Sequence, residues 1–170
     1  SPAGVSSQTI ELSGAQVVTS GDDPLVRKAA EVLVDELALR TGVTLSAAGT
    51  ADGVQILIGR ESDLAAGNAA LGRELGALPP TGTEGYKLLV AEDGKCVVVA
   101  GNDPRGVLYG VGRLLRSCEL RNGSILLPAA TTVSSTPQYA VRGHELHPSP
   151  RAKSPDEAWA KENFEQYVRE

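Results

Sequence analysis

The sequence predicts an α/β (α+β) fold, a two-layer sandwich in which a mixed β-sheet carries two helices on one face. Two segments, which begin at Pro24 and Pro104, repeat apolar residues every three or four positions, as an amphipathic helix does. Short stretches rich in Val, Leu and Ile surround them and are separated by Gly, Pro, Asn and Asp. The composition, 41% hydrophobic and 22% charged, is that of an ordinary globular chain.

The first elements are two short strands and a long helix. Residues 9–12 alternate in polarity, and 17–18 are expected to continue the sheet. Asp23-Pro24 is typical of a helix start, with the aspartate as N-cap and the proline at the first helical position. The helix is expected to end near Thr41, with Gly42 as its C-terminal cap. Its apolar stripe consists of Leu25, Val26, Ala29, Ala30, Leu33 and Leu37.

The middle of the chain contains one well-defined strand between weaker signals. Residues 43–45 are a short strand candidate, and 54–59 are a strand whose alternate residues share one face. Leu57 lies on the other face of that strand, which indicates partial burial there too. Residues 62–78 are rich in Ala, Gly and Leu and are interpreted as weakly helical or irregular.

Two hairpins flank the second helix. Residues 86–91 and 95–100 are joined by Asp93-Gly94, which is expected to supply the positive φ angles of a tight turn. Asp103-Pro104 repeats the helix-start pattern, and Asn122-Gly123 predicts a further hairpin. The apolar stripe of the second helix is Val107, Leu108, Val111, Leu114, Leu115 and Cys118.

The amino-acid composition of the chain changes after Pro128, and this change predicts a domain boundary. We assign residues 8–128 to an α/β domain and 129–138, rich in small and hydroxyl residues, to a linker. Residues 139–170 contain one expected strand, followed by a helix that Ser154-Pro155 opens. Because one strand and one helix cannot form a core, we expect the chain to end shortly after a second domain has begun.

Composition excludes several classes of function. The net charge is −5 and no basic block is present, so neither nucleic acid nor an anionic membrane is an expected partner. No apolar run approaches the roughly 20 residues that span a bilayer. Aromatic residues make up only 4% of the chain, which weakens any carbohydrate site built on aromatic stacking.

The search for chemistry finds no catalytic residue, no metal site and no cofactor motif. His144 and His147 are three residues apart in an expected strand, where they would point to opposite faces. Neighbouring acids, such as Asp22 with Asp23 and Glu92 with Asp93, fit helix capping and turns better than sugar hydrolysis.

The glycines of the second helix match neither a dinucleotide loop nor a phosphate loop. Gly106, Gly110 and Gly112 instead predict that this helix lies close against the sheet.

Cys96 and Cys118 are the only cysteines. The second helix is expected to run back across the sheet and to bring Cys118 near the strand that Cys96 begins. A disulfide is compatible with that geometry, and two buried free thiols are the alternative.

Four motifs, in this order along the chain, carry a resemblance to a known family. The motifs are Ile56-Leu57-Ile58-Gly59, Glu84-Gly85-Tyr86, Gly106-Val107-Leu108-Tyr109-Gly110 with Leu114-Leu115, and Tyr139-Ala140-Val141-Arg142-Gly143. With these motifs the chain resembles the N-terminal domain that precedes the catalytic barrel in β-N-acetylhexosaminidases, α-glucuronidases and related glycoside hydrolases, over most of residues 8 to 145.

The resemblance implies that residues 139–170 are the first strand and helix of a truncated (β/α)8 barrel. It also implies that Arg142 contacts the sugar, with an ordinary structural arginine at a domain junction as the alternative. The family's catalytic carboxylates lie beyond Glu170, so none is assigned here. Relatives commonly continue from the Arg-Gly toward an Asp, where this chain has the stretch from His144 to His147.

The function that follows is that of an accessory, non-catalytic domain of a secreted bacterial-type glycoside hydrolase of hexosaminidase or α-glucuronidase type. Its expected partners are its own catalytic barrel and, through the full-length enzyme, a carbohydrate substrate. The expected location is secreted or periplasmic, with the signal peptide removed. Two alternatives remain. One is a stand-alone carbohydrate-binding module, which needs an exposed aromatic platform, whereas Tyr86 and Tyr109 fall in expected strands and helices. The other is a protein-interaction module that uses Trp159, Phe164 and Tyr167.

Overall fold

A computed structural model describes residues 8–46 and 53–141. The chain divides into two units after Gln138, and every element named below belongs to the first unit.

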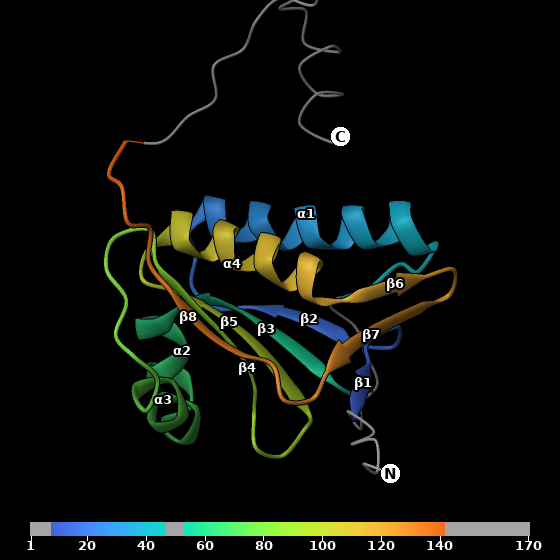
Figure 1. Ribbon diagram of the computed structural model, residues 1–170, viewed down its shortest axis with the longest axis horizontal. Coiled ribbons are helices and arrows are strands. Elements are labelled where there is room, and N and C mark those ends of the chain that lie inside the picture. The colour runs from blue at the N-terminus through green and yellow to red at the C-terminus, as the bar shows by residue number, and fades with distance from the viewer. Residues whose placement is uncertain (1–7, 47–52, 142–170) are drawn as a thin grey trace, which may run out of the picture. The chain divides into compact units, whose positions relative to one another are not determined.

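The larger of two sheets has five strands in the order β2-β3-β5-β4-β8 (Figure 1). Strands β2 (Gln16–Thr19), β3 (Gln55–Arg60) and β5 (Cys96–Gly101) run parallel to one another. Strand β4 (Tyr86–Val90) is antiparallel to β5, and β8 (Thr132–Ser135) is antiparallel to β4. The predicted mixed sheet is thereby confirmed.

The two long helices, α1 (Pro24–Thr41) and α4 (Pro104–Ser117), lie on the same face of this sheet (Figure 1). Asp23 and Asp103 cap their first turns through their side chains, and Gly42 ends α1 with a φ of 72°, as predicted. Among the described residues, no helix combines the length and apolarity needed to cross a bilayer.

The main core lies between these two helices and the sheet. It is built from Val, Leu, Ile and Ala that the helix stripes and alternate strand positions bring together. Its side chains less than 2% exposed include Leu33, Leu37, Ile56, Ile58, Leu88, Val97, Val99, Val107, Val111 and Leu114.

Two short helices cover part of the opposite face of the sheet. Residues 62–78, expected to be weakly helical or irregular, form most of α2 (Glu61–Gly67) and α3 (Ala69–Gly76). A second apolar cluster lies beneath them, made of Leu64, Leu71, Leu75, Leu89, Ala91, Val98 and Ala100, with Leu57 packed against it. The α/β fold class is confirmed, and this helix pair is an addition to the expected two-layer arrangement.

The smaller sheet is antiparallel and has the order β1-β7-β6. It joins the start of the described chain to a late hairpin: β1 (Thr9–Glu11) pairs with β7 (Ser124–Pro128), which pairs with β6 (Glu119–Arg121). Gly123, with a φ of 76°, makes the predicted turn between β6 and β7.

Two local predictions are wrong. Residues 43–45 form no strand; the neighbouring Ser46 makes a single bridge to Gln16. In the β4–β5 turn only Gly94 has a positive φ (66°), because Asp93 acts through its side chain, which accepts a hydrogen bond from Lys95 N at 2.8 Å.

The predicted linker at 129–138 contains β8 and therefore contributes to the sheet. Its small Ser and Thr residues suit an edge strand, which needs little more than a backbone to pair, so its composition resembles that of a linker. The assignment of residues 139–170 to a following barrel stays a prediction.

The side chain of Glu11 on β1 links this strand to β7 in the small sheet. Its carboxylate accepts hydrogen bonds from Ile125 N (2.9 Å), Ser124 Oγ (2.8 Å) and Ser13 N (3.0 Å). Burial alone would raise the pKa of Glu11, but these hydrogen bonds outweigh it and lower the pKa from 4.5 to about 2.

A pH-dependent contribution to stability follows. Because the folded pKa lies below the unfolded one, the ionised carboxylate stabilises the fold fully above about pH 4.5 and ceases to do so as the pH falls to about 2. We expect Glu11→Gln to lower the free energy of unfolding at pH 7 by about 1 kcal/mol or less, since the group is largely exposed. The deficit should shrink between pH 4.5 and pH 2.

Urea unfolding across that pH range measures the effect. Glu31→Gln, which removes an exposed carboxylate from α1, is the matched control and should show no such trend. A deficit for Glu11→Gln that stayed constant down to pH 2 would contradict this account.

Candidate functional site

The two central motifs of the sequence meet where α4 lies on β4 and β5. A Cβ atom at Gly106 would stand 2.1 Å from the carbonyl oxygen of Gly85, and one at Gly110 would stand 2.6 Å from Cγ1 of Val99. Neither position has room for a side chain. The predicted close packing is confirmed for these two glycines, so the motif serves packing rather than phosphate binding.

Gly112 does not take part in this packing. A Cβ atom there would have only Nη1 of Arg116 within 4 Å, at 3.3 Å, and that atom is the free end of a flexible side chain. The position faces away from the sheet.

Asp103 links the beginning of α4 to the loop that precedes β4. One carboxylate oxygen accepts a hydrogen bond from Gly106 N (2.9 Å) and the other from Glu84 N (2.6 Å). Glu84 has a φ of 59°, the left-handed region that non-glycine residues rarely adopt. Arg105 pairs with the Glu84 carboxylate at 3.1 Å. The polar groups at this junction therefore hold the loop rather than a ligand.

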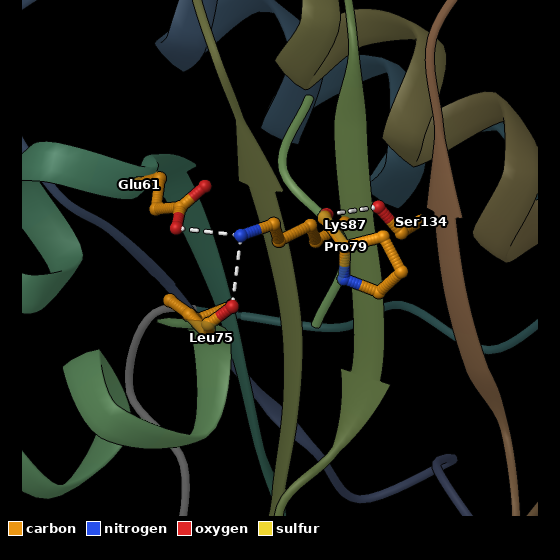
Figure 2. Close-up of polar contacts among 5 residues, drawn as sticks. All are labelled: Glu61, Leu75, Pro79, Lys87 and Ser134. Carbon is orange, nitrogen blue, oxygen red and sulfur yellow. Dashed lines mark hydrogen bonds and ion pairs between the residues drawn. The ribbon is translucent and has the colours of Figure 1, made fainter. Parts of the chain in front are cut away.

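A buried lysine joins both short helices to the sheet (Figure 2). Lys87 Nζ on β4 donates hydrogen bonds to Glu61 Oε1, at the start of α2, and to the carbonyl oxygen of Leu75, near the end of α3, both at 2.8 Å. Its side chain is only 4% exposed. Beside it, Ser134 Oγ on β8 donates to the carbonyl oxygen of Pro79 at 2.6 Å. Sequence reasoning missed this role, because the partners lie in distant segments.

Asp23 caps α1 and Asp93 holds a turn, as predicted for these acids. Glu61 and Asp63 instead form ion pairs, with Lys87 and with Arg60 at 3.0 Å. In the described ranges, no group of three His, Cys, Asp or Glu side chains could hold a metal ion.

The two cysteines are free thiols, and the disulfide is not formed. Cys96 packs against the cluster beneath α2 and α3, whereas Cys118 packs against the main core on the opposite face. Burial raises the pKa of Cys118 to about 11, and burial together with the charges of Asp93 and Glu74 raises that of Cys96. Neither thiol is therefore poised as a nucleophile at neutral pH.

Of the tyrosines considered for sugar binding, Tyr86 packs near Gly110 under α4, and Tyr109 is 43% exposed. Arg142, the predicted sugar contact, lies outside the described residues, as do His144 and His147. The aromatic residues of the predicted last helix, Trp159, Phe164 and Tyr167, also lie outside them.

The family follows from a sequence comparison. Residues 4–132 match the model described as glycosyl hydrolase family 20, domain 2. The chain belongs to this family. The resemblance is thereby confirmed for the three motifs within residues 4–132, and the described domain is an accessory domain of the glycoside hydrolase type. The motif at 139–143 lies beyond the matched residues.

Solved structures share the fold. A mutant β-hexosaminidase of Streptomyces plicatus in complex with GlcNAc superposes with a TM-score of 0.51 at 20% identity, over 78% of this chain and 24% of its own. A GH20 exo-β-N-acetylglucosaminidase from Vibrio harveyi gives 0.50 at 16% identity, over 77% and 17%.

This chain thus spans about a quarter or less of the length of the enzymes whose fold it shares. No curated protein sequence matches it.

The glycine contacts predict opposite effects of the same substitution. Gly106→Ala should destabilise the domain by about 3 kcal/mol, because the backbone of α4 would have to move away from that of Gly85, just before β4. Gly112→Ala is the matched control and should stabilise it by about 0.5–1 kcal/mol through helix propensity. Chemical denaturation of both variants measures the difference, and equal effects would contradict the proposed close approach.

The buried lysine predicts coupling between two helices and one strand. Lys87→Met should cost about 2–3 kcal/mol, since Glu61 loses its cation while its side chain, 29% exposed, keeps partial access to water. Adding Glu61→Gln should restore part of this loss, giving a coupling of about 1 kcal/mol in a double-mutant cycle.

Lys28→Met, at the exposed pair with Glu31, is the control for that cycle and should leave stability unchanged. Strictly additive effects at positions 61 and 87 would show that the ion pair contributes no coupling.

Proposed function

We propose that this chain supplies the non-catalytic N-terminal domain of a secreted glycoside hydrolase that removes N-acetylhexosamine units from glycans. The match of residues 4–132 to domain 2 of glycosyl hydrolase family 20 carries the proposal. In this proposal the catalytic carboxylates belong to a barrel domain that follows in the same enzyme.

The role of the domain is mechanical support for that barrel. The acids and the buried lysine described above are engaged in caps, turns and ion pairs, which supports a scaffold rather than a reaction centre. A hydrolytic site requires two carboxyl groups that flank the sugar bond, one of them with a raised pKa. The pKa of Glu11 is instead lowered, to about 2, by the hydrogen bonds that its carboxylate accepts.

Arg142 is the one residue of this chain that we propose to contact the substrate. The assignment rests on the Arg-Gly motif at positions 142–143. By the family resemblance, an arginine at this place contacts the sugar in the catalytic subsite. The proposed location, outside the cytoplasm, likewise rests on the family resemblance.

Enzyme assays test the proposal. The 170-residue chain should not hydrolyse any of a panel of aryl glycosides, whereas the parent enzyme should hydrolyse aryl N-acetyl-β-glucosaminide. Removing the domain from the parent should lower its yield and melting temperature more than its kcat. Turnover by the chain itself, or a collapse of kcat in a still-folded truncated enzyme, would refute the proposed role.

A further inference from the structure

We propose that a groove between the end of α4 and β8 binds an anionic sugar, a glycan unit that carries a carboxylate or sulfate group. The groove has a volume of about 490 Å³, within the range of small-ligand sites. Arg113, Arg116 and Ser117 form one wall, and the chain from Pro128 to Val133 forms the other.

The charge of the groove is positive in a chain of net charge −5. Arg113 and Arg116 are exposed, and neither makes an ion pair with a described residue. Helix α4 contains no Asp or Glu, and no carboxylate lines the groove. Two guanidinium groups are thus left for an external anion, and their planar forks suit carboxylate and sulfate oxygens.

Hydroxyl groups stand beside the arginines with fixed orientations. Ser117 Oγ donates its proton to the carbonyl oxygen of Arg113 (2.9 Å), and Thr131 Oγ1 donates to that of Pro128 (2.6 Å). The lone pairs of both oxygens remain able to accept hydrogen bonds from the hydroxyls of a sugar.

The edge of the sheet adds a donor at the same place. The carbonyl oxygen of Thr131 accepts from Val90 N, so the alternation of an antiparallel ladder turns the N–H of Thr132 away from β4. Thr132 itself lines the groove. The two guanidinium groups suit an anionic group, and the two hydroxyl oxygens and the N–H of Thr132 suit sugar hydroxyls. Together they fit a hydroxylated anion better than a simple inorganic ion.

The low aromatic content of the chain does not oppose this site. Recognition through arginine forks and hydroxyl groups needs no aromatic platform, and two arginines are too few to hold a nucleic acid backbone. The site belongs to the accessory domain alone, and the proposal does not depend on the activity assigned to the parent enzyme.

Titration calorimetry with the 170-residue chain at low salt tests the proposal. The probes are an oligogalacturonate, a sulfated disaccharide, neutral chitotriose and inorganic sulfate. We expect millimolar or tighter binding of at least one of the two charged sugars, none of chitotriose, and weaker binding of inorganic sulfate. The two charged sugars distinguish carboxylate from sulfate recognition.

Paired variants locate the site. Arg113→Gln with Arg116→Gln should weaken binding about tenfold or more and leave the melting temperature unchanged. Arg27→Gln with Lys28→Gln removes the same charge from the exposed face of α1 and should leave the affinity unchanged.

Three results would overturn the proposal: no binding of either charged sugar at about 10 mM, equal binding of inorganic sulfate, or equal losses in the two variant pairs. None of these measurements involves turnover, so failure of this site and failure of the proposed function are separate results.

Discussion

The close approach of α4 to Gly85, just before β4, and to Val99 on β5 is the constraint on which the rest of the domain depends. Gly106 and Gly110, one helical turn apart, let the helix rest directly on the carbonyl of Gly85 and on Val99. This approach sets the depth at which Val107, Val111 and Leu114 enter the core. It also places Asp103 where it can cap the helix and hold Glu84 in its left-handed conformation at once. A motif that marks the family is therefore explained by packing alone.

The two short helices on the opposite face of the sheet need an additional contact to fix their position. Helices α2 and α3 are too short to be stable by themselves, and their apolar cluster is small. Lys87 compensates by engaging the first residue of one helix and a carbonyl near the end of the other. Because burial removes the charge of Lys87 from water, the formation of the ion pair contributes little net free energy, although removal of one partner alone is costly. The two contacts of Lys87 form only when both helices are correctly placed. The lysine thus specifies where the two helices sit.

Local signals made much of the fold predictable. The Asp-Pro pairs identified both long helices because a cap and a fixed φ act within a few residues, and Gly42 identified an end for the same reason. By contrast, β8 and the α2–α3 pair owe their structure to distant partners, β4 and the apolar face of the sheet. The groove escaped prediction for the same reason, since its walls come from α4 and from residues 128–133. The expected path of the second helix predicted that Cys118 lies near Cys96. In the structure the two thiols pack against different apolar clusters, which lie on opposite faces of the sheet.

The position of β8 has a consequence for biosynthesis. On the ribosome, β4 is made long before its outer partner, and β1 must wait still longer for β7, which follows α4. A nascent chain that has emerged only as far as α4 would expose the hydrogen-bonding edge of β4 and an unpaired first strand. Such non-local pairing slows folding and leaves edges open to association. The domain is consequently a candidate for chaperone protection until Ser135 has left the exit tunnel.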